Sequence, residues 1–322
     1  MAGTAVSISS LKAQDPQLSQ FYSAPLYLGP SFAGAEGIPR VGLNFRAQWI
    51  QLPDPFLTTS VFADHYIEKY KLGIGLMVMN DAAGGLLNST YISTQYAYRI
   101  DLGKNFYFVP GLQAQYFTKR INTDKLLFSD QIFDGEVLPG GSIESIDKTR
   151  YGHFDFAVSG LIFNEKFWFG ITENHLMKLN ANLPDKEEYS SLMFSAYGGA
   201  TFNISRRRLL SANPKTITPA FNLRIQDKLQ QLDLGIYMIN SPYMLGLWYR
   251  GIPVITNTYT HDGISLLIGL QAGMLSVSYS YDFTLSKLVS TTGGSHEISL
   301  LYKFPPQQSR RKRIHAIPCP HF

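Results

Sequence analysis

Hydrophobic and polar residues alternate along most of the chain. Between Leu275 and Thr284 every odd-numbered residue is apolar, and serine, aspartate or threonine fills each even-numbered position. The stretches 41–49 and 217–225 largely follow the same period of two. This period is typical of a β-strand with one apolar and one polar face, so we predict an all-β protein.

The alternation divides into about 14 strands of roughly 9 to 13 residues, a length that crosses a bilayer when the strand is tilted. The strands are predicted to begin near residues 40, 56, 70, 88, 105, 150, 166, 190, 215, 231, 243, 262, 273 and 295. Strands this apolar on one face must close on themselves in lipid, because unpaired backbone cannot face hydrocarbon. An even number of strands suits a closed bacterial barrel.

Short and long connections alternate between the predicted strands. Residues 164–165 and 272–273 are short even-numbered connections, whereas the odd-numbered connections 118–149 and 284–294 are long. The eighth and ninth connections depart from this rule. Outer-membrane barrels have short periplasmic turns and longer outer loops. We therefore predict a transmembrane antiparallel β-barrel of about 14 strands with both termini in the periplasm.

The composition agrees with this fold. Charged residues make up 16% of the chain, against about 25% in soluble domains. The mean hydropathy of −0.05 is too polar for a bundle of membrane helices. The uncharged stretch 263–281 has the length of a membrane helix, but its alternation predicts two strands joined by a turn at Ala272-Gly273.

The chain divides into four parts. Residues 1–13 are predicted to be a signal-peptide remnant or a non-native start, because they lack the basic start and apolar stretch of a complete signal. Residues 14–39 form an N-terminal periplasmic or plug segment. Residues 40–304 form the β-barrel, and 305–322 form a basic periplasmic tail.

The excess positive charge lies in the tail. The net charge is +4, and removing Arg310, Arg311, Lys312 and Arg313 leaves 28 − 4 = 24 basic residues against 24 acidic ones. A nucleic-acid-binding protein spreads positive charge over one face. The neutral body therefore argues against a nucleic-acid partner.

A second basic cluster, Arg206, Arg207 and Arg208, lies in the eighth connection, on the same predicted periplasmic side. Two interpretations of the clusters are open: charge runs that face water or phospholipid headgroups, or docking sites for an acidic periplasmic partner. The tail also holds Cys319, which we group with the docking residues. As the single cysteine, it can form neither an internal disulfide nor a Cys-based zinc site.

Charged residues also fall on the inward face of several predicted strands. They are Arg46, Asp155, Arg224, Asp233, Arg250, Asp282 and Glu297, three positive and four negative. They could pair and fill a narrow lumen, as buried charges must, or they could form a selectivity filter or a ligand-coordinating lining. An open porin is expected to carry an excess of one sign, so the near balance favours a plugged or narrow barrel.

Aromatic residues near the predicted strand ends are expected to form the girdles that anchor a barrel at the membrane interfaces. The candidates are Tyr22, Tyr27, Trp49, Phe106, Tyr107, Phe167, Trp168, Tyr243, Trp248 and Tyr249. Only a minority of them need contact a partner.

No arrangement of residues indicates catalysis. Ser295, His296 and Glu297 are consecutive, but neighbours on a strand point to opposite faces, so the serine and the histidine cannot easily share a hydrogen bond. His175 and His261 lack a third ligand at a recognisable metal-binding spacing. We therefore predict no enzyme activity, no metal and no cofactor.

Several longer segments resemble a known family. They include Gln14-Asp15-Pro16-Gln17-Leu18-Ser19-Gln20-Phe21-Tyr22, Phe45-Arg46-Ala47-Gln48-Trp49, His153-Phe154-Asp155-Phe156, Asn174-His175-Leu176, Gln231-Leu232-Asp233-Leu234-Gly235, Gly246-Leu247-Trp248-Tyr249-Arg250-Gly251, Tyr279-Ser280-Tyr281-Asp282-Phe283-Thr284, Gly293-Gly294-Ser295-His296-Glu297-Ile298-Ser299-Leu300 and Cys319-Pro320-His321-Phe322. Together they extend from about residue 14 to 322. In this order and combination, the chain resembles the PorP/SprF family of outer-membrane proteins associated with type IX secretion and gliding motility in Bacteroidetes.

The resemblance implies an outer-membrane β-barrel of the secretion and gliding apparatus that is not itself the main translocon. It implies two kinds of protein partner beside outer-membrane lipid: periplasmic subunits of the apparatus, and a secreted adhesin whose C-terminal domain the barrel helps to deliver or hold at the cell surface. The rival prediction is a transporter of small hydrophobic solutes that resembles the fatty-acid channels, with residues 14–39 as its plug.

Overall fold

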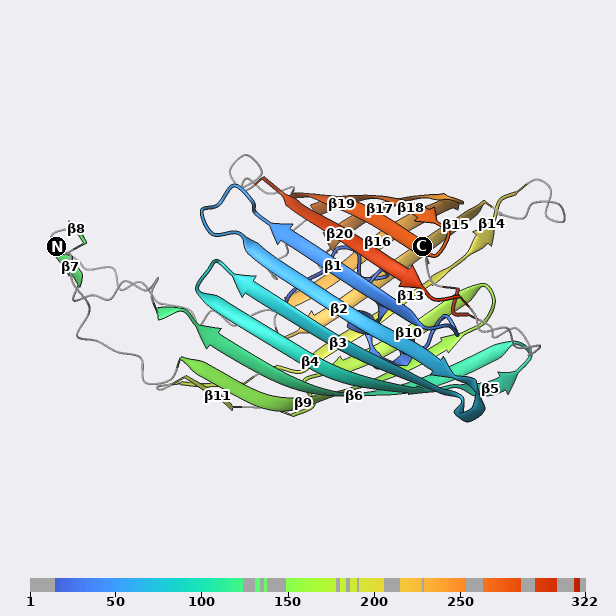
Figure 1. Ribbon diagram of the computed structural model, residues 1–322, viewed down its shortest axis with the longest axis horizontal. Coiled ribbons are helices and arrows are strands. Elements are labelled where there is room, and N and C mark those ends of the chain that lie inside the picture. Colours follow the sequence, from blue (N-terminus) through green and yellow to red (C-terminus); the bar gives the residue numbers. More distant parts are fainter. Residues whose placement is uncertain are drawn as a thin grey trace.

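Fourteen strands form one closed antiparallel barrel in the computed structural model (Figure 1). The structure describes residues 15–123, 131–133, 136–137, 149–177, 180–183, 186–189, 191–205, 215–227, 229–252, 263–284, 293–305 and 316–318. The barrel strands are β1 (Arg40–Gln48), β2 (Phe56–Ile67), β3 (Leu72–Ala83), β4 (Leu87–Tyr98), β6 (Phe106–Ile121), β9 (Arg150–Phe163), β10 (Phe167–Asn174), β13 (Met193–Ala200), β15 (Thr216–Gln226), β16 (Leu229–Asn240), β17 (Tyr243–Ile252), β18 (Gly263–Ala272), β19 (Leu275–Thr284) and β20 (Ser295–Lys303).

Each barrel strand pairs with the barrel strands before and after it in the chain. The first and last strands close the ring, because β1 pairs with β20 over its whole length with Arg46 opposite Glu297. The predicted strand number and the closed barrel are therefore confirmed. The largest shifts of a predicted strand start are small, for example from 190 to Met193 in β13.

Short elements lie at the ends of the barrel. The strand β5 (Ile100–Gly103) pairs with β6, and β14 (Phe202–Asn203) pairs with β15. Two hairpins stand apart from the barrel sheet, β7 (Ile132–Phe133) with β8 (Glu136–Val137) and β11 (Asn180–Leu183) with β12 (Lys186–Tyr189). The helical turns are α1 (Pro25–Leu28), η1 (Pro30–Phe32) and η2 (Glu68–Tyr70). Among the described residues, none of the helices has the length and apolar character to span a membrane.

The alternation places polar side chains inside the barrel and apolar ones outside. In β1, Asn44 and Arg46 are buried, whereas Leu43 and Phe45 are 37% and 40% exposed. The alternation of buried and exposed positions recurs in β2, β4 and β17, and in β17 the buried positions include the apolar Trp248. An apolar outer wall around a polar interior is the arrangement of a membrane barrel.

The two ends of the barrel carry connections of different length. We call the end with the connections 68–71, 164–166, 241–242 and 273–274 the turn end, and the other the loop end. Long connections at the loop end include 122–149, 175–192 and 253–262. The first barrel strand, β1, begins at the turn end, and the last, β20, ends there. The predicted asymmetry of the connections is thus present.

Candidate functional site: the occupied lumen

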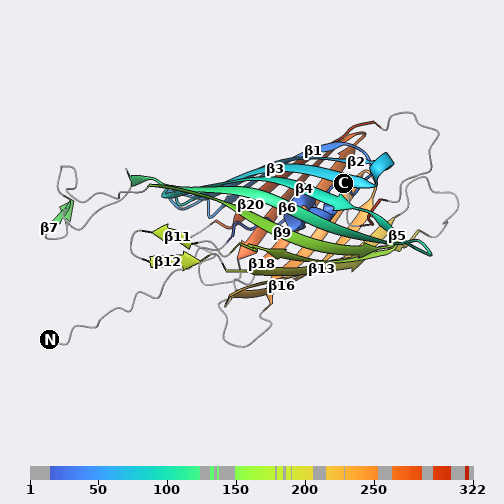
Figure 2. The ribbon, with the colours of Figure 1, turned by 90° about the horizontal axis from the view of Figure 1, so that it is seen from below.

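The lumen of the barrel is occupied by residues 15–39, which we call the N-terminal segment (Figures 1 and 2). The carboxylate of Asp15 bonds to His175, which follows β10 at the loop end. The carbonyl of Pro39 accepts from the backbone N–H of Phe304, which follows β20 at the turn end. The segment therefore runs the length of the lumen, from the loop end to the turn end.

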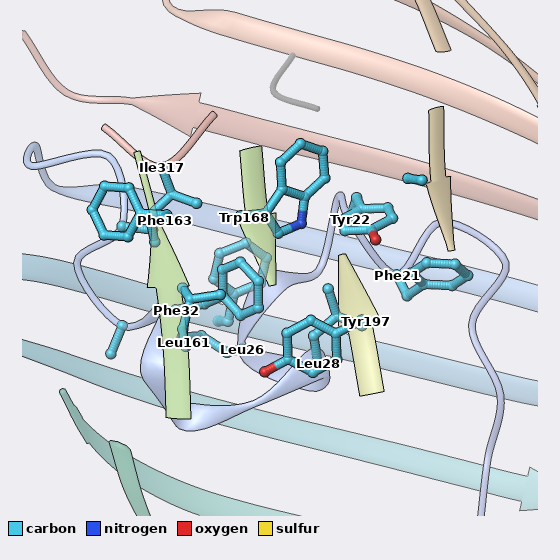
Figure 3. Packing of buried hydrophobic residues seen from close by; sticks show 14 of the residues in the cluster. Phe21, Tyr22, Leu26, Leu28, Phe32, Leu161, Phe163, Trp168, Tyr197 and Ile317 are labelled. Atoms are coloured by element: carbon cyan, nitrogen blue, oxygen red, sulfur yellow. The ribbon is translucent and has the colours of Figure 1, made fainter. Parts of the chain in front are cut away.

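Apolar side chains pack the middle of the N-terminal segment against the barrel wall. Phe21 packs edge-on against Trp248 with 4.9 Å between the ring centroids, and Tyr22 lies 6.0 Å from Trp168. Figure 3 shows this cluster from close by. Leu18, Leu26, Leu28 and Phe32 of the segment are also buried. Burial of each large apolar side chain contributes about 1.5–3 kcal/mol, so the segment is an integral part of the fold.

Glycines in the wall leave room for the N-terminal segment. A Cβ at Gly111 of β6 would lie 2.7 Å from the carbonyl carbon of Pro30, and one at Gly75 of β3 would lie 2.8 Å from a methyl carbon of Leu26. Carbon atoms approach each other favourably at about 3.5–4.0 Å. The inner surface of the wall is therefore shaped to fit this segment.

Charged side chains of the wall surround Ser19 of the N-terminal segment. Arg46 donates to the carboxylate of Asp282 at 2.7 Å, and Arg250 donates to the same carboxylate at 3.0 Å. The hydroxyl of Ser19 donates to Asp282 and accepts from both arginines. One hydroxyl of the segment thus joins three strands of the wall, β1, β17 and β19.

Glu297 of β20 holds the backbone at the same point. Its carboxylate accepts from the N–H groups of Ser19 at 2.6 Å and Gln20 at 3.0 Å, and it lies 3.4 Å from a guanidinium nitrogen of Arg46. The Gln20 amide donates to Ser280 at 3.1 Å and to the carbonyl of Glu297 at 2.9 Å. A carboxylate that holds two successive N–H groups fixes both the position and the direction of the segment.

Asp233 of β16 completes the network. It accepts from Arg224 at 3.1 Å, and its other oxygen accepts from the backbone N–H of Gly251 at 3.1 Å. The side-chain oxygen of Gln17, in the N-terminal segment, accepts from Arg250 at 3.3 Å and from Arg224 at 3.5 Å. The wall thus contacts the segment at Gln17, Ser19 and Gln20.

The six wall charges of this network balance. They are Arg46, Arg224 and Arg250, with Asp233, Asp282 and Glu297. Buried ion pairs are tolerated when the charges cancel and their hydrogen bonds are satisfied, and removing one partner leaves an uncompensated charge. We call these six residues the luminal network.

A second ionic cluster fixes the loop end of the N-terminal segment. His175 bonds to Asp155 at 2.6 Å through Nδ1 and to Asp15 at 2.7 Å through Nε2. Burial disfavours the charged imidazole, but the two carboxylates outweigh burial and raise the pKa of His175 to about 10. Both ring nitrogens are therefore protonated at neutral pH and donate to a carboxylate.

The turn end is fixed by a third set of contacts. Arg40 donates to Asp64 at 2.6 Å, and the backbone N–H of Gly34 donates to the same carboxylate at 2.7 Å. Residues from the C-terminus also reach this end: Ile317 is 1% exposed, and its N–H donates to the carbonyl of Ala35 at 3.3 Å. Part of the predicted basic tail is thus packed against the N-terminal segment.

All seven charged residues predicted to face inward lie on the inner face of the barrel, and Arg224 is the least buried of them. The structure divides them into two groups, because Asp155 belongs to the His175 cluster and the other six form the luminal network. The predicted docking residues Arg206, Arg207, Arg208, Arg310, Arg311, Lys312, Arg313 and Cys319 lie outside the described residues.

The predicted aromatic girdle is partly wrong. Phe167 and Tyr243 are 46% and 62% exposed on the outer face, as a girdle requires, but Trp168 and Trp248 are 2% and 1% exposed in the luminal cluster. Tyr22 and Tyr27 lie in the N-terminal segment, and Tyr107 packs beside the core. Trp248 stands two residues before Arg250 and therefore shares its predicted inward phase, which the girdle prediction overlooked, and Trp168 shares the inner face of β10 with Gly170 and Thr172.

Sequence reasoning missed several residues whose contacts fix the segment, among them Asp15, Ser19 and Gln20 of the segment itself and His175 after β10. Ser19 and Gln20 lie in irregular backbone that has no periodicity, so no pattern could place them. Asp64, the partner of Arg40, was detectable because it shares the inward phase of β2 with Thr58 and Ser60.

The lumen is therefore built to hold a polypeptide segment. The charged groups of the luminal network bond to the N-terminal segment and to one another. Within the described ranges, no three His, Cys, Asp or Glu side chains gather as a metal site. His296 lies on the outer face beside Tyr279, with 2.7 Å between its Nδ1 and the phenol oxygen, whereas Ser295 and Glu297 are buried on the luminal face. The three consecutive residues thus point to opposite sides of the wall.

A family model described as "Type IX secretion system membrane protein PorP/SprF" matches residues 10–302. The chain belongs to the PorP/SprF family. This membership and the barrel place the protein in the outer membrane as a component of type IX secretion. No curated protein matches the chain.

Several solved outer-membrane proteins are similar to the chain in fold. The toluene transporter TbuX of Ralstonia pickettii has a TM-score of 0.49 and 7% identity, with 88% of this chain and 94% of that chain covered. A FadL homologue of Pseudomonas aeruginosa has a TM-score of 0.43 and 10% identity, with 86% and 95% covered. The KdgM porin has a TM-score of 0.39 and 8% identity, with 83% and 99% covered.

Proposed function

We propose that this PorP/SprF protein is an anchor rather than a conduit: it helps to deliver or hold a secreted adhesin, through the adhesin's C-terminal domain, at the cell surface. The observation that carries this proposal is the occupied lumen. Residues 15–39 are attached at the loop end, around Ser19 and at the turn end. A solute would have to displace buried aromatic side chains and break a balanced ion network to pass.

The asymmetry of the barrel supports the assignment of roles to its two ends. Long connections offer contact area for a folded domain, so the loop end is the side that faces the cell surface in our proposal. The turn end faces the periplasm, and we assign the docking of subunits of the apparatus to the basic clusters Arg206–Arg208 and Arg310–Arg313 on that side. The proposal that the C-terminal tail binds periplasmic subunits is based on the tail's positive charge and on the family. Cys319 belongs to the same proposed docking region.

The rival function is a transporter of small hydrophobic solutes. Such a transporter needs a continuous path through the lumen. The segment that would have to move buries Leu18, Phe21 and Phe32 completely, which makes a transient opening costly. We infer a non-enzymatic role as well, since a secretion-system membrane protein is not an enzyme class.

Affinity purification tests the proposal. The tagged protein is isolated from outer membranes in mild detergent, and its companions are identified by mass spectrometry. We expect a large exported protein, or its C-terminal domain, together with periplasmic subunits. Recovery of the barrel alone, under conditions that preserve other outer-membrane complexes, would contradict the anchor function.

A further inference from the structure

One barrel strand has an open edge at the loop end. The strand β9 pairs with β6 over its whole length, from Arg150 to Phe163, but it pairs with β10 only from Val158 onward. In the part of the chain that the structure describes, no strand pairs with the other side of residues 150–157. Figure 1 shows β6 and β9 reaching toward the loop end beyond β10.

The direction of the backbone groups defines which residues form this edge. The carbonyl of Phe156 accepts from the N–H of Leu176 at 3.1 Å, so the even-numbered residues of β9 turn their backbone groups away from β6. The N–H of Phe156 is itself bonded to the Asp155 side chain at 2.8 Å. Among the described residues, the backbone groups of Gly152 and Phe154, with Arg150 at the end, are therefore the ones that face no partner strand.

The surroundings of this edge are exposed and basic. Phe154 is 64% exposed on the outer face. Arg150 lies directly opposite Arg120 of β6, and both are exposed. Like charges opposite each other on neighbouring strands repel. Among the described residues, neither arginine has a carboxylate within ion-pair distance.

Open edges are normally covered, because they offer backbone groups to any extended chain. Bare backbone cannot lie in hydrocarbon, so the edge is in water or is paired with a strand. Addition of an extended segment to such an edge is an established mode of peptide recognition, in which backbone hydrogen bonds give affinity and alternate side chains give specificity.

We propose that the edge of β9 from Arg150 to Phe154 is the docking site for an extended strand of the secreted partner. The partner's strand pairs with the backbone of Gly152 and Phe154. It places an apolar side chain on the ring of Phe154 and a carboxylate beside Arg120 and Arg150. The charge of the arginine pair selects an acidic strand. This inference rests on the proposed anchor function and gives it a specific contact.

Proline substitution tests the backbone contact. Gly152→Pro removes the N–H that faces the open edge and leaves the N–H groups that face β6 in place. Gly152→Ala is the matched control: it adds the same Cβ, which meets the exposed hydroxyl end of Tyr116, but it keeps the N–H. Arg150→Glu tests the charge, with Lys104→Glu at the turn end as its control.

The readout is photo-cross-linking in cells that express the full-length chain, with benzoylphenylalanine in place of Phe154, or of Phe108 on the outer wall of β6 as a control. We expect an adduct from position 154 with a strand of the exported protein, mapped by mass spectrometry next to an acidic residue. Gly152→Pro and Arg150→Glu should lower its yield at least about tenfold, and the two controls should not.

Other outcomes overturn the inference. Cross-links from position 154 to residues 124–148 of the same chain would show that the protein covers its own edge. Cross-links to lipid alone would also exclude strand pairing. So would a cross-link yield that is the same in Gly152→Pro as in the wild type. If the exported protein still co-purifies in those cases, the anchor function stands and its contact lies elsewhere. If nothing exported co-purifies at all, the anchor function itself fails.

Discussion

The contact between Glu297 and the N-terminal segment can be tested by a single isosteric change, Glu297→Gln. The carboxylate accepts two successive N–H groups, from Ser19 at 2.6 Å and Gln20 at 3.0 Å, and helps to neutralise Arg46. A hydrogen bond to a charged group contributes about 1.5–3 kcal/mol, against about 0.5–1.5 for a neutral one. Glutamine offers one acceptor oxygen where glutamate offers two, so one of the two bonds is lost and the other is weakened, and the luminal network keeps one unbalanced positive charge; the total is about 3 kcal/mol.

This loss should open the segment locally without releasing it. The change leaves the buried side chains of Phe21 and Phe32 in place. Residues 21–32 should therefore stay bound to the wall, while the residues before Phe21 detach from it. Because 1.4 kcal/mol corresponds to a factor of ten, local opening around Ser19 and Gln20 should become about 100-fold more frequent.

Hydrogen–deuterium exchange of the full-length protein in lipid nanodiscs measures this opening. A peptide that covers residues 15–22 should exchange about 100-fold faster in Glu297→Gln than in the wild type. Asp81→Asn is the control, because Asp81 is also a luminal carboxylate but accepts from Thr58 of the wall, at 2.6 Å. An acceleration below about threefold, or an equal effect in the control, would refute the assigned role of Glu297.

Three further predictions concern the loop end of the N-terminal segment, its fit to the wall, and the C-terminal tail. His175 has a pKa of about 10 when folded, above its ordinary value of about 6.5. The stabilisation of the folded state by protonated His175 should be complete below about pH 6.5 and lost as the pH rises through about 10. The measurement is the difference in thermal unfolding temperature between the wild type and His175→Gln as a function of pH. Gly111→Ala should lower the stability by about 1–3 kcal/mol, since it overpacks the segment, and Gly160→Ala, whose Cβ meets Phe108 at 3.3 Å, should cost less. Deletion of residues 305–322 should impair secretion and motility while the barrel stays folded, as shown by its heat-modifiable migration.

Each of these predictions can fail clearly. A stability difference for His175→Gln that stays constant through pH 10 would show that the imidazole is neutral when folded. Equal effects of Gly111→Ala and Gly160→Ala would mean that the wall is not fitted to the segment. Normal secretion and motility after the tail deletion would exclude the tail from coupling.

The regular part of this protein could be predicted from its sequence because period-two alternation encodes the inner and outer faces directly. Arg46 and Glu297 were both assigned to the inner face on that basis, and they are opposite each other in the β1–β20 ladder. The contact of Asp15 with His175 could not be predicted in the same way, since it joins residues 160 positions apart and both lie outside regular strands.

The two luminal tryptophans show a second limit of the pattern. Phe167-Trp168-Phe169 and Leu247-Trp248-Tyr249 are apolar at every position, so hydropathy alone does not separate their two faces, although the inward phase of Arg250 places Trp248 inside. The apolar surroundings that accept these rings inside the barrel come from the N-terminal segment, and that packing is tertiary. The direction of the segment through the lumen has the same origin: it is set by Glu297 and Asp64 of the wall and by His175 after β10, which bind particular backbone or side-chain groups of the segment.

The most direct test of an occupied lumen is single-channel conductance of the purified full-length protein in a planar lipid bilayer. If residues 15–39 fill the barrel permanently, the wild type should show almost no current over a wide voltage range, and a variant without residues 15–39 that still migrates as a folded barrel should conduct. Stable open channels in the wild type would contradict the account and favour a transport function.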